Sequence, residues 1–133
     1  MPVLYQKMIY RDDLRRNPSV LYLFGDNDKR AGLGGQAKEM RGEPNAVGLR
    51  TKRAPGKEND DYWSDKNFDA NCAKIEEDMS RVRAQLRRGG VVVIPTDGIG
   101  TNRADMERRC PRSFHVLQQT LAALVNVPVT VST

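Results

Sequence analysis

Apolar runs alternate with polar segments along the chain, and this pattern predicts an α/β protein. Residues 3–10, 20–24, 46–51, 91–94 and 127–131 are expected to form strands. The runs at 20–24 and 91–94 do not alternate between apolar and polar residues, so each is expected to be covered on both faces. The second of them, Val-Val-Val-Ile, is the best candidate for the centre of the sheet.

Helical patterns separate these strands. The clearest helix is predicted over 71–88, and a shorter one over 34–41. Residues 103–124 are expected to be mostly helical, with Pro111 at the start of the longer helix, whereas 11–18 reads as a loop or a short helical turn. The apolar stripe of the clearest helix consists of Cys72, Ile75, Met79, Val82 and Leu86. Alternating strands and helices predict a single domain, a three-layer α/β/α sandwich around a mostly parallel, mixed sheet.

The composition fits a soluble globular protein, since 38% of the 133 residues are hydrophobic and 29% are charged. No apolar run approaches the roughly 20 residues of a membrane span, and the N-terminus lacks a signal-peptide pattern. Cys72 and Cys110 lie far apart and are expected to be reduced thiols of a cytoplasmic protein. With one histidine, His115, and scattered cysteines, the sequence predicts no metal site and no cofactor.

The net charge of +5 favours anionic partners such as nucleotides, phosphates or nucleic acid. The basic residues are dispersed, and no array of aromatic residues accompanies them. Nucleic-acid binding is therefore the less favoured interpretation. The sequence gives no indication of the oligomeric state.

The stretch from residue 20 to residue 40 carries the first candidate site. It contains Gly25, Asp26, Asn27, Gly32, Gly34, Gly35 and Gln36. A strand followed by glycines and a helix start would present free N–H groups and a positive helix end to a ligand. Asn27 can donate to and accept from a sugar hydroxyl, and Asp26 can orient a water or act as a base. The alternative is an ordinary tight turn whose Asn and Asp side chains bind the local backbone.

A second loop of the same kind follows the apolar run at 91–94. It contains Thr96, Asp97, Gly98, Ile99, Gly100, Thr101 and Asn102. If both strands run parallel, their loops meet at one edge of the sheet and frame one cleft. Such a cleft suits a ligand with two phosphates between sugars. The first loop does not match the dinucleotide fingerprint, and the chain has no GxxxxGK[ST] motif, which argues against ATP-type phosphoryl transfer.

At these two loops the chain resembles the macrodomain superfamily, whose members bind ADP-ribose and related nucleotides. The segments that carry the resemblance are Leu-Phe-Gly-Asp-Asn at 23–27, Gly-Leu-Gly-Gly-Gln-Ala at 32–37 and Val-Ile-Pro-Thr-Asp-Gly-Ile-Gly at 93–100. Asp13 stands at a place comparable to the macrodomain Asp that holds adenine. The chain is also similar to a group of small uncharacterised phage and bacterial proteins that share Phe-Gly-Asp-Asn, Gly-Gly-Gln-Ala and Asp-Gly-Ile-Gly.

The macrodomain resemblance implies that the protein binds an ADP-ribose-like nucleotide or phosphorylated nucleoside between the loops. Its glycines, Gly34, Gly35, Gly98 and Gly100, would then give N–H groups to the diphosphate. Asn27 and Asp26 would hold the distal ribose, and Asp13 would contact the base. If the protein is an enzyme, it would hydrolyse an ADP-ribosyl linkage, with Asp26 or Asp97 positioning water and Asn27 orienting the sugar. The remaining residues expected to bind the ligand are Gly25, Gly32, Gln36, Thr96, Ile99, Thr101 and Asn102.

Other interpretations stay open at this point. The protein could be a non-catalytic phage-type module that sequesters a nucleotide signal in the host cytoplasm, or a basic nucleic-acid-binding protein. A nucleoside-processing glycosidase or transferase is a further alternative. Tyr62 and Trp63, which interrupt a polar loop, are expected either to stack on a base or to pack against the sheet.

Overall fold

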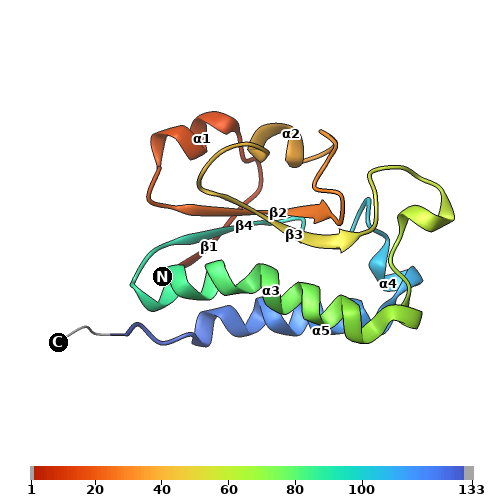
Figure 1. Ribbon diagram of the computed structural model, residues 1–133. Coiled ribbons are helices and arrows are strands. Elements are labelled where there is room, and N and C mark those ends of the chain that lie inside the picture. Colours follow the sequence, from red (N-terminus) through yellow and green to blue (C-terminus); the bar gives the residue numbers. More distant parts are fainter. Residues whose placement is uncertain (1, 131–133) are drawn as a thin grey trace.

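A four-stranded sheet forms the middle of the molecule in the computed structural model, which describes residues 2–130 (Figure 1). Its strands are β1 (Val3–Gln6), β2 (Leu21–Asn27), β3 (Ala46–Lys52) and β4 (Val92–Pro95). They lie in the order β1-β4-β2-β3, and each pair in this sheet is parallel. The α/β class and the central place of the Val-Val-Val-Ile strand are confirmed, and the sheet is parallel throughout rather than mixed.

Helices cover both faces of the sheet (Figure 1). One face carries α1 (Arg11–Arg16) and α2 (Ala37–Met40), and the other carries α3 (Phe68–Arg87) and α5 (Pro111–Ala122). The short elements are α4 (Met106–Arg109) and the 3-10 turns η1 (Asn59–Asp61), η2 (Asp65–Asn67) and η3 (Ala123–Asn126). Within residues 2–130, each helix is too short or too polar to cross a membrane.

Two apolar cores explain why β2 shows no alternation of apolar and polar residues. Leu21 and Leu23 belong to the core shared with α3 and α5, whereas Tyr22 and Phe24 belong to the core under α1 and α2. Because both faces of the strand are covered, all four side chains are buried. Gly25, the next residue, is the first exposed position of the strand.

Several element boundaries differ from the prediction. The strand expected over 3–10 ends at Gln6, and the helix expected over 34–41 is a single turn, Ala37–Met40, because glycines occupy the positions before it. Pro111 does begin α5. Cys72 is half-buried, whereas the other four residues of the predicted apolar stripe of α3 are fully buried.

The strand predicted at 127–131 is wrong for residues 127–130, which have no regular structure, and residue 131 lies outside the described residues. The N–H of Val127 donates to the carbonyl of Leu124 and closes η3, and Pro128 has no N–H. Val127 packs half-buried against the core near α3, and the N–H of Thr130 donates to the carbonyl of Arg87 over 2.6 Å. This segment therefore bonds to a helix end instead of a sheet edge.

Charged side chains close the outer edge of β3. The carbonyl of Gly48 accepts a hydrogen bond of 2.6 Å from Arg30, and the N–H of Arg50 donates to Asp78 over 2.8 Å. Unpaired backbone groups on an edge strand invite pairing with another chain. Here the side chains of Arg30 and Asp78 form hydrogen bonds with these backbone groups, which hinders the pairing of another strand with this edge.

Candidate functional site

A cleft of about 270 Å³ lies at the carboxyl end of the sheet. One wall comes from the first glycine loop (residues 28–36), which follows β2, and the other from the second glycine loop (residues 96–105), which follows β4. Gly25 and Thr51 lie between the two walls, and Lys7 and Met8 extend the rim beyond β1. Parallel sheets bind ligands at this end of their strands.

Most of the residues predicted for the site line this one cleft. They are Gly25, Asp26, Gly34, Gly35, Gln36, Asp97, Gly98, Ile99, Gly100, Thr101 and Asn102. The two loops are thus brought together in space, because β2 and β4 are adjacent parallel strands. The roles assigned to the individual residues stay predictions.

Other predicted residues do not line the cleft. Asp13 lies in α1, where its carboxylate accepts a hydrogen bond from the N–H of Tyr10 over 2.9 Å and helps to start that helix. Gly32 packs beside Pro55, with a φ of 95° that favours glycine. Thr96 follows β4 but is not part of the lining. The assignments of adenine to Asp13 and of ligand contacts to Gly32 and Thr96 therefore find no support in the geometry.

Asn27 is also directed away from the cleft. Its amide nitrogen donates to the carbonyl of Ala31 over 2.7 Å, and its side-chain oxygen accepts from the N–H of Lys29 over 3.1 Å. The residue is 5% exposed. These bonds are those of a tight turn in which the Asn side chain binds the local backbone, so Asn27 shapes the loop and does not present its amide to a ligand.

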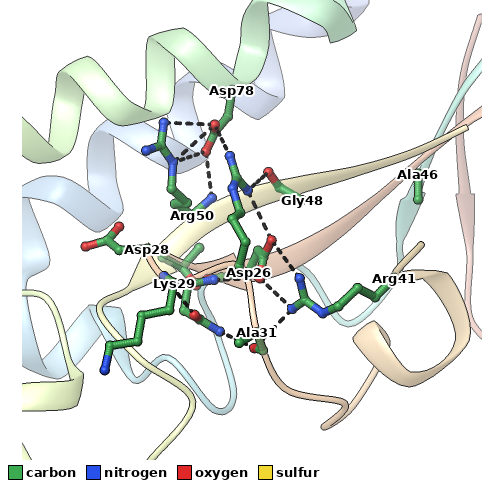
Figure 2. Close-up of polar contacts among 12 residues, drawn as sticks. Asp26, Asp28, Lys29, Ala31, Arg41, Ala46, Gly48, Arg50 and Asp78 are labelled. Atoms are coloured by element: carbon green, nitrogen blue, oxygen red, sulfur yellow. Dashed lines mark hydrogen bonds and ion pairs between the residues drawn. The ribbon is translucent and has the colours of Figure 1, made fainter. Parts of the chain in front are cut away.

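Asp26 contributes to the cleft wall, but its carboxylate belongs to an ion-pair network (Figure 2). Its oxygens lie 2.6 Å from a nitrogen of Arg41 and 3.1 Å from one of Arg30. The N–H of Asn27 adds a third bond of 2.8 Å. Because two guanidinium groups occupy this buried carboxylate, it is unavailable to position a water, and Asp97 is the remaining acid of the cleft.

The network continues around the edge of the sheet to α3. Arg30 also reaches Asp78 over 2.7 Å, and Asp78 in turn binds the guanidinium of Arg50 over 3.0 Å (Figure 2). Arg30 has a φ of 52°, a left-handed conformation that costs a non-glycine residue about 1 kcal/mol. Its ion pairs with Asp26 and Asp78 offset that cost. Sequence reasoning missed this network because its members lie up to 52 residues apart, at Asp26 and Asp78.

Two cations in the cleft were also missed. Arg103 and Lys7 line it and are exposed, and within residues 2–130 neither has a carboxylate within 4.0 Å. Asp97 is exposed as well, and its carboxylate has no hydrogen bond or ion pair in the described part of the chain. The cleft therefore presents two positive groups and one carboxylate to a ligand. In the sequence, Lys7 and Arg103 look like any of the dispersed basic residues.

One family model matches the chain over residues 4–120, and it is described as a family of unknown function, DUF7831. The chain belongs to this family. The match includes all four strands except the first residue of β1, and both glycine loops, so the cleft lies within the part that defines DUF7831. No curated protein and no solved structure matches the chain.

The cleft of this DUF7831 protein contains a buried polar atom without a partner. Gln36 lines the cleft, and its side-chain oxygen, Oε1, has no hydrogen bond within residues 2–130. An unsatisfied buried acceptor costs about 1–3 kcal/mol. Because the oxygen itself is shielded from the cleft, a ligand could reach it only after the side chain of Gln36 turned outward.

Neither aromatic residue near the cleft of the DUF7831 protein offers an open ring face. Trp63 is 3% exposed within the core, and its indole N–H points to Asp28 at 3.3 Å. The ring of Tyr62 contacts two cations, with Lys52 Nζ 4.3 Å and Arg109 Cζ 3.7 Å from its centroid. Of the two interpretations of these aromatic residues, packing is the one that the structure shows.

Proposed function

We propose that this DUF7831 protein binds an ADP-ribose-like nucleotide or a phosphorylated nucleoside in the cleft, with a macrodomain-like fold. The main support is that two glycine-bearing loops, which follow the adjacent parallel strands β2 and β4, line a single cleft. Gly25, which is exposed and lines the cleft, allows a ligand to approach the main chain closely.

The chemistry of the lining supports a phosphorylated sugar. Lys7 and Arg103 supply positive charge for phosphate. The exposed side chain of Asn102 can donate to and accept from sugar hydroxyls, and the hydroxyl of Thr101, which donates to the carbonyl of Asp97 over 2.8 Å, can still accept. The α2 helix is a single turn, so the positive charge on the cleft comes from side chains and not from a long helix dipole.

Hydrolysis of an ADP-ribosyl linkage would depend on Asp97, since Asp26 is held by Arg30 and Arg41. An exposed carboxylate at a cleft can orient a water and take its proton as the water attacks the anomeric carbon. In Asp97→Asn the binding of ADP-ribose is expected to remain and turnover of ADP-ribosylated substrates to fall roughly 100-fold or more. Tight binding without product in the unmodified protein would instead favour a sequestering module.

Titration calorimetry with ADP-ribose tests the binding proposal, and Gly25 provides a steric probe of the cleft. A methyl group there would lie 3.9 Å from Ile99 Cγ2 and from Thr51 Oγ1, which is ordinary contact, and the backbone is not left-handed. Gly25→Ala should therefore fold normally, and the larger Gly25→Val is compared with it once circular dichroism and Tm show that it is folded. They should weaken ADP-ribose binding in that order.

The absence of heat at millimolar ADP-ribose would contradict the proposal, and unchanged binding in Gly25→Val would place the ligand elsewhere. Nucleic-acid binding through the basic surface is the alternative. It would show a steep fall in affinity with salt and no response to Gly25→Val.

A further inference from the structure

The side chain of Arg103 crosses the cleft from the second glycine loop to the first. A methyl group placed on Gly34 would overlap Arg103 Nη1 and lie 3.1 Å from its Cζ. A methyl group on Gly35 would lie 3.4 Å from Arg103 Nε. The guanidinium therefore lies directly against the main chain of these two glycines.

A side chain at position 34 would meet the far end of the Arg103 side chain, which would have to move aside. Gly35 has a φ of 58°, a left-handed conformation that itself favours glycine, whereas Gly34 does not have a positive φ. The backbone at Gly34 would accept another residue, but the space beside it is filled by Arg103. Gly34, one of the glycines whose N–H groups were expected to bind the diphosphate, thus leaves space for an arginine of the opposite wall.

The charge of Arg103 is unbalanced. Within residues 2–130 its guanidinium has no carboxylate within 4.0 Å, and the nearby Asp105 is paired with Arg108 and Arg109. Neighbouring charges act on Lys52: burial lowers its pKa, the charge of Asp61 raises it, and the charges of Arg103 and Arg109 lower it again. An exposed guanidinium in such surroundings is suited to an anion.

We propose that Arg103 is the residue that binds the phosphate of the ligand, and that it does so as a planar fork that lies against the Gly34–Gly35 main chain. The inference rests on the proposed function and deepens it, because it assigns phosphate recognition to a guanidinium in place of the loop N–H groups. Arginine presents two parallel N–H donors to phosphate, a geometry that lysine cannot reproduce.

The test uses calorimetric titration of the full chain with two probes, ADP-ribose and inorganic pyrophosphate. Arg103→Gln is expected to weaken binding of both probes roughly tenfold to a hundredfold, and Arg103→Lys to recover only a small part of that loss. Arg108→Gln is the control for the loss of one positive charge: Arg108 is exposed and does not line the cleft, although, unlike Arg103, it is paired with Asp105. It should change affinity less than about threefold at 0.15 M salt.

A double-mutant cycle tests the part played by Gly34. Gly34→Ala should displace the guanidinium and weaken binding in the unmodified protein, but have little further effect in the Arg103→Gln background. Equal effects of Arg103→Gln and Arg108→Gln, or additive effects of Gly34→Ala and Arg103→Gln, would overturn the inference and leave the proposed function in place.

The two probes separate the two proposals. If pyrophosphate binds in an Arg103-dependent way and ADP-ribose does not bind, the nucleotide proposal fails and the role of Arg103 stands. If neither probe binds at millimolar concentration, both proposals are overturned. Circular dichroism of each variant shows whether a loss of binding reflects a loss of fold.

Discussion

Arg30 Nη2 lies 2.7 Å from Asp78 Oδ1, although 48 residues separate the two in sequence. Arg30 belongs to the first glycine loop and Asp78 to α3, on the far side of the sheet edge (Figure 2). The other end of the same guanidinium binds Asp26 and the carbonyl of Gly48. One side chain thus connects a wall of the cleft, the edge strand and the longest helix.

Removal of Asp78 should destabilise the protein strongly. Its side chain is 3% exposed and pairs with Arg30 and Arg50, so Asp78→Ala removes the carboxylate that the two guanidinium groups share and leaves Arg30 with Asp26 and Arg50 with the exposed Glu77. We expect a loss of about 3 kcal/mol in the free energy of unfolding, at the lower end of the range for buried pairs because the Arg30 side chain is 43% exposed and both arginines keep a second carboxylate. Urea unfolding followed by circular dichroism measures it.

The neighbouring Glu77 provides the control for this prediction. Its side chain is 77% exposed and contacts Arg50 over 3.3 Å. Surface ion pairs contribute little, so Glu77→Ala should change stability by less than about 1 kcal/mol. Similar losses in the two variants would show that the network does not stabilise the fold.

Asp65 should stabilise the start of α5. Its carboxylate accepts hydrogen bonds from the N–H groups of Arg112 and Ser113, over 2.9 and 3.0 Å, and no residue of that helix caps it. We expect Asp65→Ala to lower the free energy of unfolding by about 1 kcal/mol. Asp60→Ala, at an exposed acid with no hydrogen bond or ion pair within residues 2–130, should leave it unchanged.

The contribution of Asp65 should also depend on pH. Burial raises the pKa of this carboxyl, but the hydrogen bonds from Arg112 and Ser113 outweigh burial and bring it below its ordinary value of 3.8. A lowered pKa means that the stabilisation is present above pH 3.8 and is lost as the pH falls through the folded-state pKa. Unfolding curves between pH 5 and pH 2.5 should therefore show a smaller decline in Asp65→Ala than in the unmodified protein.

Cys110 should be unreactive in the native protein. It is 1% exposed, and burial, with smaller contributions from the charges of Asp65 and Asp105, raises the pKa of its thiol to about 12. At pH 8 a thiol reagent should modify the half-buried Cys72 first, and Cys110 only after unfolding in urea. Mass spectrometry of the modified peptides distinguishes the two sites, and equal rates would contradict the burial argument.

The same thiol makes stability fall in alkali. A raised pKa means that the contribution is fully present below the ordinary value of 9.0 and is lost as the pH rises toward about 12. The urea midpoint should therefore drop between pH 8 and pH 10.5, and the drop should be smaller in Cys110→Ala than in Cys72→Ala. Burial raises the pKa of Tyr22 and acts in the same direction in all three proteins.

The layered fold could be predicted because its signals are local and periodic. The uninterrupted apolar residues of β2 and β4 predict strands covered on both faces, and the stripe along α3 predicts a buried helix face. Once the strands are parallel, the convergence of their loops follows from geometry. The strand expected at 127–131 is wrong over the described residues 127–130: β-branched residues form a strand only when the segment pairs with a sheet, and this one bonds to the end of α3 and to η3.

Which polar side chains of the loops face the cleft, and which bind other groups of the protein, could not be predicted from the sequence. Asp26 and Asn27 look the same in a sequence whether they face a ligand or bind their own backbone, and here long-range arginines and a local turn decide the matter. Arg103 lies against Gly34, a residue 69 positions away in the sequence, and this contact places its guanidinium in the cleft. Such pairings arise only when the chain is folded.

The anchoring of the first glycine loop has a consequence for the energetics of ligand capture. The side-chain amide of Asn27 donates to the carbonyl of Ala31, and Arg41 donates to the carbonyl of Gly32 over 2.8 Å. The guanidinium of Arg30 connects the loop to the sheet and to α3. A segment fastened at so many points has already lost most of its conformational entropy during folding. The loop is therefore preorganised before a ligand binds, and little of the binding free energy is spent on ordering that side of the cleft.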